Sequence, residues 1–173
     1  EFWTGTGWRP LPTQLLPRTD SESAAVASLP RIPPETTACF RTARRTRAAT
    51  GQASILHRDG EAYRVQTGSL QAAGRRGGNA ILDTIRFQDI PLGRYTAMVQ
   101  QTRSHSQWDD ATRVESATAE TGPLAAVLTV KTRFEPSAED DSLPFATTHR
   151  LVFLPDCDWW VAELVSIRNL ARQ

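Results

Sequence analysis

The chain has 173 residues, of which 39% are hydrophobic and 23% charged, and its formal net charge is +1. This composition excludes a disordered chain, and the near-zero charge provides no overall attraction to nucleic acid or to a membrane surface. No run of about 18 apolar residues is present, so we expect no transmembrane segment. The absence of a signal peptide and of an Asn-x-Ser/Thr sequon favours an intracellular location.

The charges are distributed unevenly along the chain. Residues 1–76 carry eleven arginines against six acidic residues, whereas residues 77–173 carry nine basic against 13 acidic residues. This asymmetry indicates either an acidic partner for the first part or complementarity within the chain, and we favour the second interpretation because single surface charges contribute little. The two cysteines, Cys39 and Cys157, form no zinc motif, and we predict neither a metal site nor a cofactor.

The first 34 residues are predicted to form a proline-rich strap or tail, and residues 35–173 a single domain. The six prolines of residues 1–34 interrupt any long helix there, so that only one short helix is predicted, over Asp20–Leu29. Trp3 and Trp8 are unexpected in a tail, because an ordered tryptophan usually buries a large apolar surface. Two interpretations are therefore open. The segment is either a strap that docks on a protein partner or on the domain's own sheet, or a chain end whose tryptophans pack incidentally.

A basic helix is predicted over residues 34–50, ended by Gly51. Arg41, Arg44 and Arg45 share one side of it and, with the two tryptophans, are the candidate partner-binding residues. Such arginines can bind phosphate, but a solvated face bonded to the acidic half of the chain is favoured. Aromatic residues do not interleave with them, so there is no strong indication of nucleic-acid binding.

Several strands are predicted in the middle of the chain. A hairpin is expected over residues 53–67 around Asp59-Gly60, followed by a flexible Gly/Arg loop over residues 68–79. Two further strands are expected over residues 80–90 and Tyr95–Arg103, and they are joined by a turn at Pro91-Leu92-Gly93. Residues 112–120 fit a short edge strand, with a helix as the competing interpretation.

The clearest pattern lies in Gly122–Leu154. Apolar residues alternate with polar ones through 124–134, an acidic loop follows, and residues 145–154 supply a partner strand. One dry and one wet face are typical of an antiparallel sheet covered on a single side.

The end of the chain carries two overlapping patterns. Trp159, Val161 and Val165 share a strand face, whereas Trp160, Leu164 and Ile167 fit a helix, so a strand with a helical C-terminal end is predicted. The predicted fold class is therefore α+β: a curved antiparallel sheet of six to seven strands, packed on one face by one to three helices.

No catalytic residue is assigned. The three histidines lack a second histidine or a cysteine at metal-ligand spacing, and Ser104-His105-Ser106 with nearby aspartates is a sequence neighbourhood rather than a triad geometry.

Residues 81–164 resemble the VASt domain, a START-like module. The resemblance rests on Pro91-Leu92-Gly93, Gln101-Thr102, Val130–Phe134 and Trp159-Trp160. It implies a curved sheet gripping a helix around an apolar cavity for a sterol or similar lipid, without catalysis. The candidate ligand-binding residues are then apolar or aromatic strand residues: Phe87, Tyr95, Val99, Leu128, Val130, Phe134, Leu151, Phe153 and Trp160.

A second resemblance is to chorismate lyase, through Pro91–Tyr95 and Phe153-Leu154-Pro155. That family places a glutamate two residues before the Phe-Leu-Pro, and here the position is Leu151, so the expected acid is missing. The leading hypothesis is a non-catalytic binding module for an apolar ligand. The alternatives are an accessory or interaction subunit of a larger assembly, and a small-molecule enzyme in which Arg94 or Arg133 binds a carboxylate.

Overall fold

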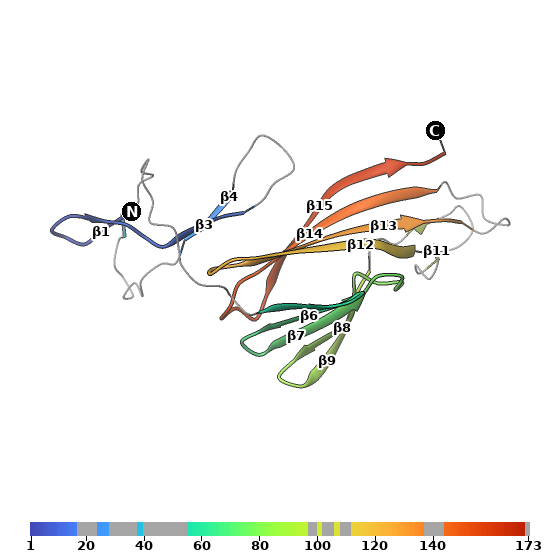
Figure 1. Ribbon diagram of the computed structural model, residues 1–173, viewed down its shortest axis with the longest axis horizontal. Helices are drawn as coiled ribbons and strands as arrows, with labels where there is room; N and C mark the ends of the chain where they lie inside the picture. Colours follow the sequence, from blue (N-terminus) through green and yellow to red (C-terminus); the bar gives the residue numbers. More distant parts are fainter. Residues whose placement is uncertain are drawn as a thin grey trace. The chain divides into compact units, whose positions relative to one another are not determined.

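The computed structural model contains only β-structure in the residues it describes, which are 1–16, 24–27, 38–39, 55–96, 100–101, 106–107, 112–136 and 144–171. All regular elements of these ranges are strands, and they form a five-stranded sheet, a four-stranded sheet and three two-stranded ribbons (Figure 1). The predicted α+β class is therefore wrong, and this part of the chain is all-β. In these same ranges no helix is long and apolar enough to cross a bilayer.

The chain divides into two compact units, which are described separately. The first comprises residues 1–53 and 121–125, and the second comprises residues 54–120 and 126–173. The first unit holds two ribbons of paired strands: β1 (Phe2–Trp3) with β2 (Trp8–Arg9), and β3 (Thr13–Leu16) with β4 (Ala24–Ala27).

The helix predicted over Asp20–Leu29 is wrong at its described residues, because Ala24–Ala27 forms strand β4 and pairs in antiparallel register with Thr13–Leu16. Alanine has the highest intrinsic helix propensity, but such propensities are small, and pairing with a neighbouring strand overrides them here. The helix predicted over residues 34–50 falls outside the described residues except for positions 38–39.

In the same unit the Gln14 side chain binds the 121–125 turn. Its Oε1 atom accepts hydrogen bonds from the backbone amides of Leu124 and Ala125 at 2.8 and 2.9 Å.

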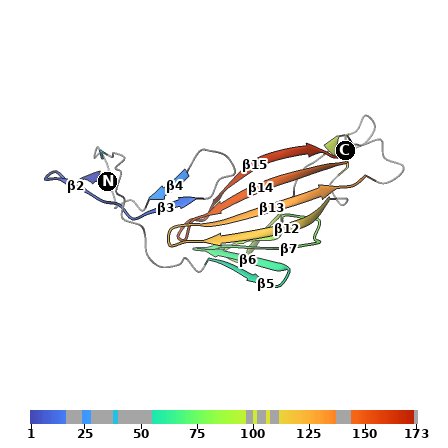
Figure 2. The same cartoon turned by 45° about the horizontal axis from the view of Figure 1, so that its top comes forward.

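The second unit begins with a five-stranded antiparallel meander (Figure 2). Its strands, in both chain and spatial order, are β5 (Leu56–Asp59), β6 (Ala62–Thr67), β7 (Leu70–Arg75), β8 (Leu82–Phe87) and β9 (Ile90–Tyr95). Buried and exposed residues alternate along β6 and β7, so one face of this sheet is dry and the other wet. The predicted hairpin around Asp59-Gly60 is confirmed, with Gly60 supplying the positive φ of the turn.

The loop predicted over residues 68–79 is wrong, because half of it forms β7. Gly74 lies in the middle of this strand for a packing reason rather than for flexibility. A Cβ atom there would meet the Ile81 carbonyl oxygen and lie 2.6 Å from the Tyr63 ring. The glycine therefore lets Tyr63 cross the sheet and donate a hydrogen bond to that same carbonyl.

The β8–β9 turn lies earlier than predicted. Gln88 and Asp89 form it with φ of 46° and 66°, the left-handed conformation that two-residue hairpin turns require. Pro91-Leu92-Gly93, the predicted turn, lies within β9. Of the strand predicted over Tyr95–Arg103, Tyr95 ends β9 and Gln100–Gln101 form β10, which pairs with β11 (Ser106–Gln107), whereas residues 97–99 and 102–103 lie outside the described residues. The strand predicted over residues 80–90 is confirmed as β8.

The four-stranded sheet completes the second unit. Its strands are β12 (Thr112–Thr121), β13 (Ala126–Phe134), β14 (Phe145–Phe153) and β15 (Trp160–Asn169), in that spatial order. The predicted hairpin of Gly122–Leu154 is confirmed, with an unbroken register from Ala126 opposite Phe153 to Phe134 opposite Phe145. The strand interpretation of residues 112–120 is also confirmed.

The helical C-terminal end is wrong, because β15 continues to Asn169. The register of β14 with β15 shifts between Thr148 and His149, which leaves Val165 as an extra residue without a partner on β14. This β-bulge explains the misleading pattern. Trp160, Leu164 and Ile167 are spaced as on a helix, but the extra residue places all three on one face of a strand.

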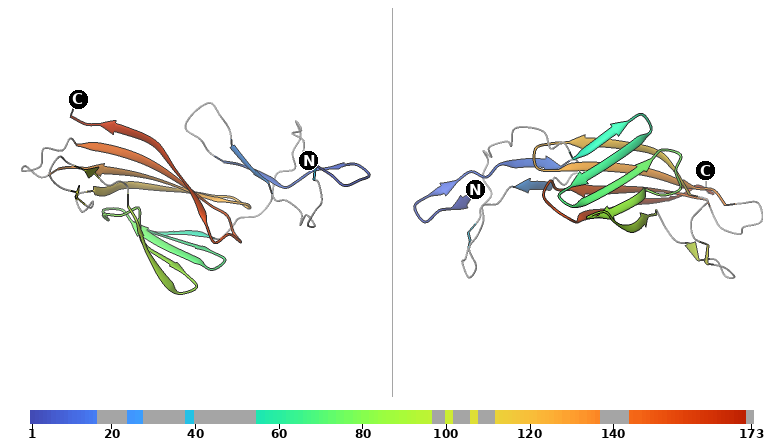
Figure 3. Two further views of the ribbon diagram at one scale, coloured as in Figure 1. Left: turned by 180° about the vertical axis from the view of Figure 1, so that it is seen from behind. Right: turned by 90° about the horizontal axis from the view of Figure 1, so that it is seen from below.

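The two sheets of the second unit enclose its core (Figure 3). The largest fully buried side chains come from both sheets and include Tyr63, Leu70, Leu82, Leu128 and Phe153. Polar contacts join the sheets at their ends. The Thr67 hydroxyl donates to the Cys157 carbonyl, the Ser69 amide donates to Asp158, and Val114 exchanges two backbone hydrogen bonds with Gly77 and Gly78.

Candidate functional site

The predicted ligand-binding residues belong to the core between the sheets. Five of them share the inner face of β13 and β14 and are buried: Leu128, Val130, Phe134, Leu151 and Phe153. Phe87 and Tyr95 come from the opposite sheet, Trp160 is half-buried on β15, and Val99 lies outside the described residues. The expected helical cover of this face is wrong for the described chain, because the five-stranded sheet covers it instead.

A short polar chain crosses this otherwise apolar interior. The Tyr95 hydroxyl lies 3.3 Å from His149 Nδ1, His149 Nε2 lies 3.0 Å from the Thr147 hydroxyl, and that hydroxyl lies 2.6 Å from the Thr132 hydroxyl. Burial lowers the pKa of His149 and raises the pKa of Tyr95. The four groups satisfy one another as neutral partners, which fits a structural network between the sheets better than a proton-transfer site.

The predicted partner-binding residues lie in the first unit or outside the described chain. Trp3 and Trp8 stand directly opposite each other in the β1–β2 ribbon, with ring centroids 5.5 Å apart, and Trp3 remains exposed. The two rings therefore shield each other in part. Arg41, Arg44 and Arg45 lie outside the described residues.

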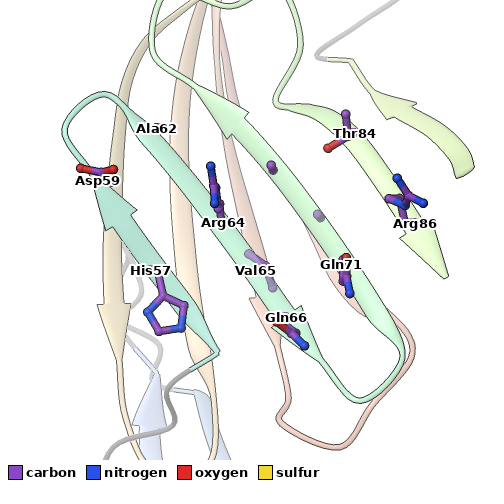
Figure 4. Close-up of a pocket in the computed structure, with 11 residues that line it drawn as sticks. His57, Asp59, Ala62, Arg64, Val65, Gln66, Gln71, Thr84 and Arg86 are labelled. Carbon is purple, nitrogen blue, oxygen red and sulfur yellow. The ribbon is translucent and has the colours of Figure 1, made fainter. Parts of the chain in front are cut away.

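A groove of about 550 Å³ lies on the wet face of the five-stranded sheet (Figure 4). His57 and Arg64 stand opposite each other on β5 and β6, and Gln71 stands opposite Arg86 on β7 and β8. Arg86 is also bonded to Asp89 in the adjacent turn. These side chains offer donors to a polar or anionic molecule, but they lie on an open sheet surface. Among the described residues, no group of three potential metal ligands occurs.

Free sheet edges are the places where a β-protein can pair with another chain, and the five- and four-stranded sheets together have four. Three of these four edges are protected. Strand β5 is only four residues long and ends in His57, Arg58 and Asp59, all exposed. Strand β9 contains Pro91, which has no amide hydrogen, and its register is irregular. Strand β12 is tied at Val114 to the β7–β8 turn by two backbone hydrogen bonds.

The fourth edge, β15, contains no proline, and no backbone hydrogen bond among the described residues ties it to the five-stranded sheet. It does contain the register shift at Val165 and the charged residues Glu163 and Arg168. It is ten residues long, and among the described strands only β14 pairs with it. Leu164 is 50% exposed and Ile167 56% exposed, and both lie on the face of the sheet that β14 uses for the core. Val161 and Val165 are also exposed, as is Trp159 immediately before the strand. The strand therefore presents unpaired backbone groups flanked by apolar side chains.

This edge was missed by sequence reasoning, which assigned Trp160 to a ligand cavity and Leu164 and Ile167 to a helix. One indication was available. Over most of β12 and over β13 from Leu128 onwards apolar or small residues alternate with polar ones, whereas β15 has apolar residues on both faces along much of its length, as a strand does when it is covered on both sides.

One buried ion pair joins β15 to β14. Arg150 Nη1 donates to Glu163 Oε2 at 2.7 Å, with the Arg150 side chain 6% and the Glu163 side chain 38% exposed. The Arg150 Nε and Nη2 atoms have no hydrogen-bond partner among the described residues. Glu163 therefore holds a guanidinium that would otherwise be a buried, uncompensated charge. No family model, curated protein or solved structure shows significant similarity to the chain.

Proposed function

We propose that the chain is a non-catalytic interaction module, which joins another protein chain by accepting its β-strand along the edge of β15. The observation that carries this proposal is the contrast among the four edges of the five- and four-stranded sheets. Natural proteins blunt exposed edges because they promote pairing with other chains, and an edge left long and apolar is one that a partner covers.

The apolar side chains of β15 support the same proposal. In strand addition the backbone hydrogen bonds supply affinity, and side chains on alternate positions supply specificity. The side chains of Leu164 and Ile167 would pass from half exposed to buried on pairing, which is favourable at about 25 cal/mol per Å² of apolar surface. Binding of an apolar ligand between the sheets stays a prediction, since the groove described above lies on the outside of the five-stranded sheet.

The test is native mass spectrometry of the tagged full chain isolated from its source, comparing the wild type with Ile167→Lys. Lysine on an exposed edge strand opposes pairing, and because Ile167 is largely exposed the substitution should leave the fold intact. We expect the wild type to carry a second protein chain and Ile167→Lys to be free of it. Gln71→Lys, an exposed position on the five-stranded sheet, is the matched control and should keep the partner.

An assembly that survives Ile167→Lys unchanged would contradict the proposal, and so would a wild-type protein that is monomeric in its source. Circular dichroism and urea denaturation of the three proteins establish that each is folded, so that loss of assembly is not mistaken for loss of structure.

A further inference from the structure

The two faces of β15 are arranged symmetrically about the point between Val165 and Ser166. Residues paired with inward-facing positions of β14 are Trp160, Ala162, Leu164, Ile167 and Asn169, and residues paired with outward-facing positions include Val161, Glu163, Ser166 and Arg168. Leu164 and Ile167 lie at equal sequence distances on either side of that point and share one face. Glu163 and Arg168 do the same on the other face.

This symmetry depends on the bulge. In a regular strand, residues three or five positions apart lie on opposite faces, because side chains alternate with a period of two. The extra residue Val165 restores Leu164 and Ile167 to one face, and Glu163 and Arg168 to the other. Antiparallel pairing of two such strands about a two-fold axis would therefore place like faces together.

From this pattern we infer that the chain covering β15 is a second copy of the same protein, paired antiparallel with the axis between Val165 and Ser166. This inference rests on the proposed function and names its partner. In this register Leu164 stands opposite Ile167 of the second copy, and Glu163 stands opposite Arg168 of the second copy, each pair occurring twice. An isologous contact of this kind closes as a dimer and uses the β15 edge of both copies.

The charges fit this register. Glu163 binds Arg150 through Oε2, while its Oε1 has no bonded partner among the described residues and remains available to Arg168 of the second copy. Arg168 is exposed and has no ion pair within the described chain. Opposite charges directly across an antiparallel pair are favourable, and like charges there are unfavourable. The assembled sheet would run continuously through β12–β15 of both copies, and the paired β15 strands would be about 33 Å long.

The register is tested by disulfide trapping in the full chain with Cys39→Ser and Cys157→Ser. Adding Leu164→Cys and Ile167→Cys places thiols directly opposite each other across the dimer, within the Cα separation that a disulfide accepts. We expect oxidation to give a covalent dimer. The matched control carries Leu164→Cys and Ser166→Cys, whose side chains lie on opposite faces, and it should remain monomeric on denaturing gels. Equal or faster trapping of the control would overturn the inference.

The partner's identity is tested by sedimentation of the purified wild-type chain, which we expect to be dimeric at about 100 µM and to dissociate on dilution. Arg168→Glu places two glutamates opposite each other at each pair, and we expect the dissociation constant to rise about tenfold. Arg94→Glu, the same change on exposed β9, should leave it unaltered. Equal constants for the two variants would overturn the inference.

The outcomes separate this inference from the proposed function. A wild-type chain that is monomeric at every concentration overturns self-pairing. If the assembly isolated from the source nevertheless contains a different protein and is lost in Ile167→Lys, the β15 edge is an interaction surface for that protein, and only the second copy is excluded.

Discussion

Strands β14 and β15 are neighbours in one hairpin, similar in length and both rich in apolar residues, yet their surroundings are opposite. Leu151 and Phe153 of β14 are completely buried, whereas Leu164 and Ile167 of β15 are half exposed. The five-stranded sheet covers the face of β14 and makes contact there through Tyr95 and His149. A strand pattern therefore shows which side chains share a face, but whether that face is covered depends on how far the opposing layer extends.

Truncating one leucine on each strand should give the largest difference in free energy of unfolding between the covered and the exposed strand. Leu151→Ala removes a fully buried side chain and should lower the free energy of unfolding by about 3 kcal/mol, through lost burial and an unfilled cavity. Leu164→Ala on the neighbouring strand should cost less than about 1 kcal/mol in the monomer. Urea denaturation at low protein concentration measures both losses. Similar losses at the two positions would show that β15 is covered within the monomer.

The ion pair between the two strands should give an intermediate effect. Glu163→Ala leaves the Arg150 guanidinium buried without its carboxylate, and we expect a loss of about 2 kcal/mol, below the value for a fully buried pair because Glu163 is partly exposed. The matched control is Glu61→Ala, which breaks the exposed pair with Arg76 and should cost less than about 0.5 kcal/mol. If the two variants lose the same stability, the strands are not linked through a buried charge.

The smallest effect concerns the pH dependence of the covered side. Burial holds the pKa of His149 below its ordinary value of 6.5, so on acidification the unfolded chain takes up a proton before the folded chain does. The stability that the neutral imidazole provides is complete above about pH 6.5 and is lost as the pH falls towards the folded-state pKa. Denaturation between pH 8 and pH 5.5, a span covering the ordinary histidine pKa, should therefore show a slope that His149→Asn reduces.

The sequence predicted the strands whose neighbours follow directly in the chain. The hairpin of Gly122–Leu154 was predicted because its alternation is unbroken, and Asp59-Gly60 was recognised because glycine is the usual residue for such a turn. The β8–β9 turn was misplaced for the same chemical reason. Gln88 and Asp89 adopt positive φ without a glycine, whereas Pro91 and Gly93 are turn-forming residues that happen to lie in a strand.

The candidate site could not be predicted in the same way. A bulge adds one residue to a strand, and at Val165 it converted a strand pattern into apparent helical spacing. Exposure of β15 is a tertiary property, because it depends on where the five-stranded sheet ends rather than on the residues of β15. Likewise, the inner-face residues of β13 and β14 were recognised as apolar, but nothing local indicates whether a helix, a ligand or a second sheet covers them.

The most direct test of the β15 edge is amide hydrogen exchange of residues 160–169 in the assembly isolated from its source, compared with the Ile167→Lys protein. We expect slow exchange along β15 in the assembly, since a partner strand would bond the outward-pointing amides, and fast exchange of those same amides in Ile167→Lys. Strands β13 and β14 should be equally protected in both proteins. Equal exchange rates along β15 in the two proteins would contradict the proposal that another chain pairs with this strand.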